Sequence, residues 1–224
     1  MVMNLCHLPE ESSRYQMDLA FPAAFTASAI HLSTFDPESS ALIVVDMING
    51  FAIEGALSSP NTHSIISPIA QLMSRCQKHG IATLLFADTH SQESPEFQSY
   101  PVHCLQGSVE SEPVQELYRI GGYDLIAKNS TNGFLEPEFQ QWLATHPQIT
   151  SFIVTGCCTD ICVQQFSLAL KTEFNRRNLP SRVVVPMELT ATYDAPGHPA
   201  WITELASYQN MQTSGVEIVT QITD

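Results

Sequence analysis

Basic residues are scarce in this chain of 224 residues. Nine Lys and Arg side chains stand against 23 Asp and Glu side chains, which gives a formal net charge of −14 at pH 7. Proteins that bind nucleic acid need clustered positive charge to neutralise the phosphate backbone. The composition therefore argues against a nucleic-acid partner.

Long apolar runs are also missing. No stretch approaches the roughly 18 consecutive apolar residues of a membrane span, and the opening MVMNLCHLPEESSRYQ lacks the charged-then-apolar layout of a signal peptide. We therefore expect a cytoplasmic protein without a membrane partner. The six cysteines are irregularly spaced and two are adjacent, unlike the disulfide framework of a small secreted domain, so we expect thiols.

The sequence does contain a regular alternation of short apolar runs and helical patterns. Runs rich in Val, Ile and Leu, which predict buried strands, lie at residues 41–46, 82–88, 123–128, 151–156, 182–186 and 216–220. Helical patterns lie between them, at 64–80, 137–147, 159–177 and 199–210. This alternation predicts an α/β fold, a three-layer α/β/α sandwich with a mostly parallel, six-stranded, Rossmann-like sheet.

The length and the 44% hydrophobic content fit one domain with a single large core. Residues 1–40 precede the first strand, are rich in Ser, Pro and Ala, and show no clear period. We interpret them as an N-terminal extension packed on the surface, without a domain of its own. Residues 41–224 then form the domain that carries the function.

Polar side chains stand where neighbouring strands end. Asp46 ends the first predicted strand, Asp88 the second and Lys128 the third, and residues 156–162 follow the fourth. In an open parallel sheet, ligands bind beyond the carboxyl ends of the strands. Each residue alone could simply meet solvent or cap a helix, but their coincidence on one edge predicts a functional site.

The segment VTGCCTDICV places three cysteines at a strand-to-helix turn. If Thr159 or Asp160 caps the helix, Cys162 falls in its first turn, where free N–H groups and the helix dipole favour a thiolate. Cys162 is then the better nucleophile, and Cys157 and Cys158 contribute mainly backbone. Two alternatives stay open, a redox or metal role for the neighbouring pair and an ordinary buried thiol at Cys162.

Three motifs together resemble a known family. ALIVVDMINGF, IAKNSTNGF and VTGCCTDICV are similar to the Asp, Lys and Cys motifs of the isochorismatase-like cysteine hydrolases, in the right order over residues 41 to about 170. The segment DTH…PEFQSYPVH is similar to the metal segment of nicotinamidases. The resemblance implies a catalytic triad of Asp46, Lys128 and Cys162.

The resemblance also implies details of the site. In the family the peptide between the residues at Cys157 and Cys158 is cis, and the backbone amides of Cys158 and Cys162 would form the oxyanion hole. Asp46 acts as the base, and the Cys162 thiolate adds to an amide carbonyl, releases ammonia and leaves a thioester that water hydrolyses. This chemistry requires no organic cofactor. Isochorismatase itself lacks the Cys nucleophile, which argues against vinyl-ether hydrolysis.

A candidate metal segment follows the second strand. Asp88, His90, Glu96 and His103 supply two carboxylates and two imidazoles, a set that suits Zn, Mn or Fe. Such residues are also ordinary in exposed loops. Nicotinamidases carry His or Glu at the third position, which Glu96 fills here, although Glu93 competes. We expect a divalent ion, with Zn as the first choice, and in the family this ion takes the substrate's pyridine nitrogen.

The substrate pocket needs apolar walls for a flat ring. Phe51, Tyr100 and Phe134 match aromatic pocket positions of nicotinamidases, or else are core aromatics. The resulting hypothesis is a metal-dependent amidohydrolase that converts nicotinamide to nicotinate and ammonia and takes part in NAD salvage. One alternative is another amidase of this fold, acting on a carbamoyl, ureido or aliphatic amide, and a second is a non-catalytic binding protein. The sequence leaves homo-oligomer formation open.

Overall fold

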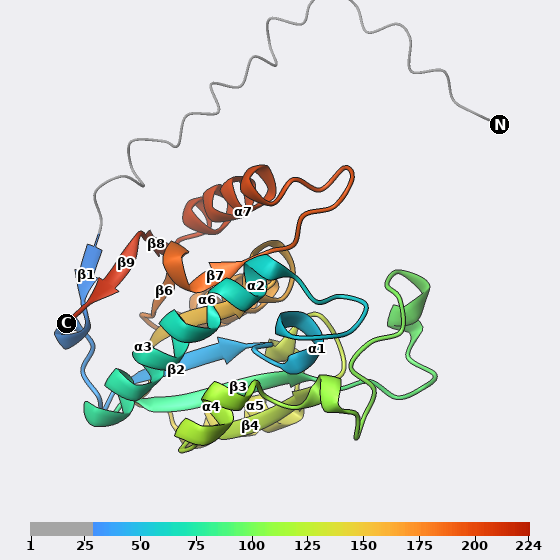
Figure 1. The fold of residues 1–224 in the computed structure, drawn as a ribbon. Coiled ribbons are helices and arrows are strands. Elements are labelled where there is room, and N and C mark those ends of the chain that lie inside the picture. Colours follow the sequence, from blue (N-terminus) through green and yellow to red (C-terminus); the bar gives the residue numbers. More distant parts are fainter. Residues whose placement is uncertain (1–28) are drawn as a thin grey trace, which may run out of the picture.

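The structure is a computed structural model that describes residues 29–224 (Figure 1). Residues 1–28 of the expected extension lie outside the described residues. The main sheet contains seven strands, and six form its continuous path in the order β4-β3-β2-β5-β6-β8. These are β2 (Ser40–Val45), β3 (Ala82–Asp88), β4 (Asp124–Lys128), β5 (Ser151–Cys157), β6 (Arg182–Pro186) and β8 (Glu217–Val219).

All six predicted strands are present, and every pairing in this sheet is parallel. The seventh strand, β7 (Thr190–Ala191), adds a short parallel pairing beside the end of β5. The α/β prediction is therefore confirmed. Parallel pairing follows from the helices that return the chain to the same end of the sheet between successive strands.

The centre of the sheet is buried on both faces, and β2 illustrates why. Its central position, flanked by β3 and β5, leaves all six of its residues buried. Leu42 and Val44 belong to the apolar cluster on one face, whereas Ile43 and Val45 belong to the cluster on the other. Because side chains alternate along a strand, a continuous apolar run is required at such a position.

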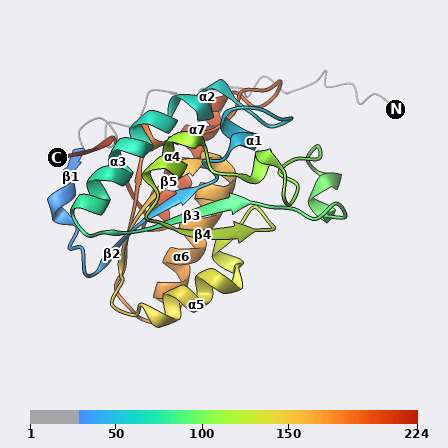
Figure 2. The same cartoon turned by 60° about the horizontal axis from the view of Figure 1, so that its bottom comes forward.

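Helices cover the two faces (Figure 2). Helices α3 (Ile66–Lys78) and α4 (Gln115–Ile120) supply the first cluster, together with α1 (Asn49–Ala52). Helices α5 (Pro137–Thr145), α6 (Gln164–Arg176) and α7 (Ala200–Thr213) supply the second. A further short helix, α2 (Pro60–Ser64), precedes α3.

Helix α3 shows how the sequence specifies these elements. Ile66, Ile69, Leu72, Met73 and Cys76 recur at helical spacing and are all buried. This stripe packs on the sheet, and the polar residues between its members face solvent or are partly buried. The helix ends before Gly80, which adopts φ +78°, a left-handed conformation that glycine reaches without steric cost.

The described part of the extension contributes to the core. Strand β1 (Ala29–His31) pairs in parallel with β9 (Gln221–Thr223) as a separate two-stranded sheet. After it, Leu32 and Phe35 are only 1% and 3% exposed. These two apolar side chains reach the first core cluster. The interpretation of residues 1–40 as an extension packed on the domain stays a prediction.

The strand order creates one switch point. From β2 the chain proceeds to β3 and then β4 on one side, and β5 returns to the opposite side of β2. Neighbouring connections therefore diverge at the carboxyl ends of β2 and β5, which is where open α/β sheets bind ligands. Across residues 29–224, the helices are all too short or too polar to cross a bilayer.

Candidate active site and metal centre

The ammonium group of Lys128 lies at the centre of a buried charged cluster. Its Nζ is 2.9 Å from Asp46 Oδ2 and 2.7 Å from Asp88 Oδ1, and it donates to the Ser130 carbonyl oxygen at 3.0 Å. The Sγ of Cys162 is 3.7 Å from the same nitrogen. Burial alone would lower the pKa of Lys128, but Asp46 and Asp88 outweigh it and raise that pKa well above its ordinary value. The structure thus brings Asp46, Lys128 and Cys162 together.

Register explains how Lys128 meets Asp88. The two residues are paired neighbours at the ends of β4 and β3. On β4, Ile126 and Lys128 are the buried positions, and Ile126 belongs to the same apolar cluster as Cys162. Alternation along the strand therefore directs Lys128 to the face that carries Cys162.

Asp46 reaches this cluster through an unusual backbone conformation. Ile43 and Val45 face the α5 and α6 side, so plain alternation would send Asp46 to the opposite side. Asp46 instead adopts φ +54°, in the left-handed region, and its carboxylate meets Lys128. Burial raises the pKa of Asp46 to about 7, with Lys128 acting against this rise. A carboxyl group with such a pKa can both accept and return a proton near neutral pH.

Cys162 lies in a π-helical turn, Thr159–Val163, that leads into α6. The expected side-chain cap is absent: the N-cap residue is Cys158, and no side chain caps the turn. Burial raises the pKa of the Cys162 thiol well above its ordinary value, although Lys128 lowers it. The thiolate at Cys162 therefore stays a prediction, because burial disfavours the charged form whereas the nearby ammonium group of Lys128 favours it. The thiol group of Cys162 lies beside the carboxyl group of Asp46.

The turn before Cys162 requires a glycine. Gly156 adopts φ +112°, and a Cβ built there would lie 1.9 Å from the carbonyl oxygen of Val45 on β2. The next peptide bond, between Cys157 and Cys158, is cis, as the resemblance implied. Cys157 is fully buried and donates its thiol to the Asp46 carbonyl oxygen at 3.3 Å.

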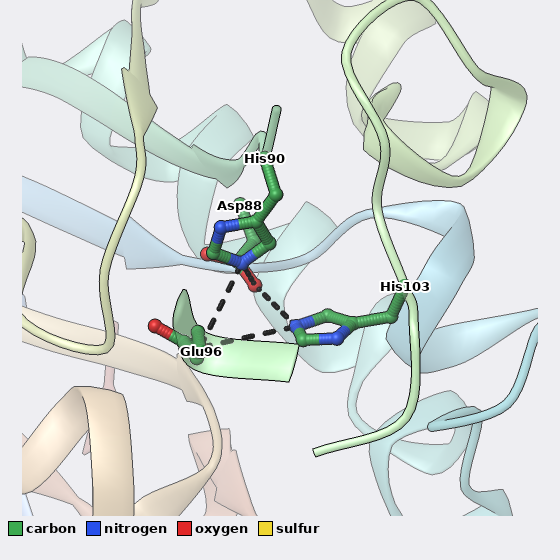
Figure 3. A group of neighbouring side chains, drawn as sticks. All are labelled: Asp88, His90, Glu96 and His103. Atoms are coloured by element: carbon green, nitrogen blue, oxygen red, sulfur yellow. Dashed lines mark hydrogen bonds and ion pairs between the residues drawn. The ribbon is translucent and has the colours of Figure 1, made fainter. Parts of the chain in front are cut away.

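The four predicted metal ligands form a second cluster, which adjoins the first through Asp88 (Figure 3). The Nε2 atoms of His90 and His103 lie 2.9 Å and 3.0 Å from Asp88 Oδ2. The same atoms lie 3.7 Å and 3.9 Å from Glu96 Oε1. One ligand atom from each residue falls within 4.8 Å of all the others. The competing residue Glu93 is exposed and outside this group.

The hydrogen bonds of His103 favour a cation at this point. Its Nδ1 lies 2.8 Å from the carbonyl oxygen of Pro101, which can only accept, so Nδ1 carries the proton. In the neutral ring, the Nε2 lone pair then faces the carboxylate of Asp88 at 3.0 Å. A positive charge between the two lone pairs, either a second ring proton or a metal ion, relieves their repulsion. Two imidazoles and two carboxylates whose ligand atoms lie within 4.8 Å of one another form a donor set that fits a divalent metal ion.

A cavity of about 270 Å³ opens onto both clusters. Asp88, Glu96 and His103 line it from the metal cluster, and Cys158 and Cys162 from the cysteine turn. Two of the three predicted aromatic residues, Phe51 and Tyr100, are in its wall. The third, Phe134, is not: its ring packs on Phe139 and Phe166 in the core. The structure favours the core alternative for Phe134, because its ring contacts rings on α5 and α6.

Comparison with known proteins decides the family. The sequence profile of the isochorismatase domain matches residues 40–220. The chain belongs to the isochorismatase-like hydrolase family. Nicotinamidase 1 of Arabidopsis thaliana is 33% identical to it over 180 residues, which cover 72% of this chain and 73% of that protein.

A further sequence relative and a solved structure are similar to this isochorismatase-like hydrolase. The nicotinamidase of Escherichia coli (strain K12) is 26% identical over 155 residues, covering 55% of this chain and 72% of that protein. Among solved structures, the pyrazinamidase of Pyrococcus horikoshii in complex with zinc has a TM-score of 0.67 at 22% identity, over 81% of this chain and 98% of that chain. This structural likeness establishes the shared fold.

Sequence patterns missed several residues of the site in this isochorismatase-like hydrolase. Asn129 Oδ1 lies 3.0 Å from His90 Nδ1, and Phe97 packs edge-on against both histidine rings. Leu57 and Tyr193 line the cavity from loops distant in sequence. Asn129 follows Lys128 directly and could have been suspected, whereas no local signal marks Tyr193.

Proposed function

We propose that this protein is a metal-dependent cysteine amidohydrolase that converts nicotinamide to nicotinate and ammonia through a thioester. The observation that carries the proposal is the shared use of Asp88. This residue contacts Lys128 through one carboxylate oxygen and both candidate metal-binding histidines through the other. A nucleophile cluster and a metal cluster are thereby joined beside one cavity. The named nicotinamidase relatives support the substrate.

In the proposed first half-reaction, Asp46 accepts the thiol proton of Cys162 as Sγ attacks the amide carbonyl carbon. The C–N bond then breaks, Asp46 returns the proton to the leaving nitrogen, and ammonia departs from a thioester. Lys128 remains protonated throughout, and its charge stabilises the carboxylate and the developing thiolate, both within its reach. The raised pKa of Cys162 makes a neighbouring base necessary.

In the second half-reaction, Asp46 accepts a proton from water, whose oxygen attacks the thioester carbonyl. The C–S bond breaks, and the thiolate regains the proton from Asp46. The product leaves as the carboxylic acid and releases its remaining proton to solvent to give nicotinate. We assign the oxyanion hole to the backbone amides of Cys158 and Cys162, because both residues line the cavity at the turn that carries Sγ.

We assign the metal site to Asp88, His90, Glu96 and His103, with zinc as the proposed ion. When bound, the ion supplies a Lewis-acidic position that can take a ring nitrogen of the substrate. Phe51 and Tyr100 are assigned to the walls around that ring, since both line the cavity and their ring centroids lie 5.8 Å and 6.2 Å from that of His103.

Ammonia release from a panel of amides tests this function. The panel is nicotinamide, pyrazinamide, benzamide, isobutyramide and an N-carbamoyl amino acid, and the protein is loaded with zinc. We expect rapid release from the first two and far slower release from benzamide, which lacks a ring nitrogen. Release only from the aliphatic or carbamoyl compounds would assign the chain to another amidase class. Tight binding without turnover of any of them would make it a binding protein.

A further inference from the structure

The loop between β7 and α7 forms one wall of the cavity. Tyr193 is the residue of this loop that lines it, on the C-terminal side of the sheet edge. The ring of Tyr193 is stacked on the imidazole of His198, with centroids 4.1 Å apart and planes inclined by 7°. One face of the tyrosine ring is therefore covered, and only the other face and the edges remain for a ligand.

Both nitrogens of His198 are held by acceptors. Its Nδ1 lies 2.9 Å from the carbonyl oxygen of Tyr193, and its Nε2 lies 2.9 Å from Asp160 Oδ2. A carbonyl and a carboxylate both require a proton from the ring, so these contacts favour the doubly protonated imidazolium. Partial burial would lower the pKa of His198, but Asp160 and the Tyr193 carbonyl outweigh it and raise that pKa.

The loop is fixed at several further points. Ala195 and His198 exchange backbone hydrogen bonds and close a tight turn. Asp194 accepts from the backbone N–H of Ala200, the first residue of α7, at 2.8 Å. Asn61 donates to the carbonyl oxygen of Thr192 at 2.9 Å and to Asp194 at 3.1 Å. These hydrogen bonds hold the loop between β7 and α7 in one conformation.

The wall is also tied to the turn that carries the nucleophile. Asp160, the partner of His198, lies between Cys158 and Cys162 in the π-helical turn. A second tie runs through Glu204 on α7, whose carboxylate accepts from the Thr192 backbone N–H at 2.9 Å and from Thr159 Oγ1 at 3.5 Å. The position of Tyr193 is therefore set relative to Cys162.

We propose that Tyr193 is a specificity-determining residue, whose ring packs against the flat ring of an aromatic amide, and that the His198–Asp160 pair is the positioning device that holds it there. The identity of the ring as a pyridine rests on the proposed function. This residue favours the binding of flat aromatic amides over aliphatic ones, because a flat ring makes a larger contact with a fixed tyrosine ring than an aliphatic chain does.

Kinetics of metal-loaded variants provide the first test. Tyr193→Ala should raise KM for nicotinamide about three- to tenfold, the range expected for one lost aromatic contact, with kcat nearly unchanged. Tyr193→Phe should keep the wild-type KM. His198→Ala should raise KM in the same direction, since the tyrosine loses its support. Equal losses of kcat for all substrates would instead indicate a merely structural loop and overturn the inference.

The structure offers a matched control. His146, the residue that follows α5, is also stacked on an aromatic ring, that of Trp142, and its Nδ1 lies 2.8 Å from the carbonyl oxygen of that residue. Neither residue lines the cavity. His146→Ala should leave KM and kcat unchanged, and a KM as high as that of His198→Ala would contradict the assignment.

Calorimetric binding separates this inference from the proposed function. Benzamide and isobutyramide are titrated into two proteins, the single variant Cys162→Ala and the double variant that carries both Cys162→Ala and Tyr193→Ala. We expect the tyrosine to strengthen benzamide binding and to leave isobutyramide binding unaffected. If the wild-type enzyme does not hydrolyse nicotinamide, the proposed function is refuted. The binding measurement would still test whether Tyr193 contacts an aromatic amide. Benzamide that binds neither protein, or both equally, would overturn the inference.

Discussion

Cys157 and Cys162 lie in one turn but have different surroundings. Cys157 packs in the first apolar cluster, to which α3 contributes, and donates its thiol to a backbone carbonyl oxygen. Cys162 instead lines the cavity, with its Sγ 3.7 Å from Lys128 Nζ. We predict that Cys162→Ala lowers kcat below about 10⁻³ of the wild-type value, because the nucleophile is lost. Cys157→Ala should keep most of the activity in the same ammonia assay. Equal losses in the two variants would exclude Cys162 as the only essential thiol.

The raised pKa of Asp46 predicts how the rate depends on pH. The base must be deprotonated to accept the thiol proton, so kcat/KM should rise with pH through about 7 and level off above it. Asp46→Asn keeps the shape but removes the base, and should lower the rate by roughly 10² to 10⁴. A pH–rate profile of each protein provides the measurement. A wild-type maximum near pH 5 would contradict this role.

At the scale of single elements, the junction of β2 and β5 depends on Gly156. Any side chain there would collide with the Val45 carbonyl oxygen, and φ +112° is unfavourable for other residues. We predict that Gly156→Ala lowers the free energy of unfolding by about 3 kcal/mol or more and displaces the cysteine turn. Chemical denaturation and the ammonia assay measure the two effects.

Gly107 provides the control for that substitution. It also has a positive φ, +77°, but a Cβ there would meet nothing within 4 Å. Gly107→Ala should therefore cost only the conformational strain, about 1–2 kcal/mol. Similar losses in the two variants would show that strain, and not the approach of two strands, is the important factor at Gly156.

For the molecule as a whole, the metal ion should act as a stabilising ligand. Asp88 ends β3, whereas Glu96 and His103 come from the loop after it, so the complete set exists only in the folded chain. Binding to the folded state alone contributes about 2.7 kcal/mol at 100 times Kd. We predict that a chelator lowers Tm by about 5–10 °C and that zinc restores it.

Substitution of two glutamates distinguishes zinc binding at this site from a nonspecific effect of zinc on Tm. Glu96→Gln should remove much of the zinc-dependent rise in Tm, because its carboxylate faces both histidines. Glu93→Gln should retain the full rise, since Glu93 is exposed and outside the cluster. Differential scanning fluorimetry with and without zinc gives the comparison. The reverse pattern would reassign the third ligand to Glu93.

The sequence alone determined the layers of the fold and the edge that holds the site. Six apolar runs became six parallel strands, because the central strands of such a sheet are buried on both faces and must be apolar throughout. Asp88 and Lys128 could be placed at one edge, since parallel strands end together. The elements that were missed are short, such as α1, α2 and β1, and periodicity needs more residues than these contain.

Tertiary structure decided where individual side chains point. Asp46 reaches Lys128 only through a left-handed backbone conformation, Glu96 and not Glu93 approaches the histidines, and Phe134 turns into the core. Tyr193 joins the cavity from a loop about 30 residues beyond Cys162. Local patterns encode burial and period, but the direction of a loop side chain depends on contacts between segments far apart in the chain, which form only when the sheet is assembled.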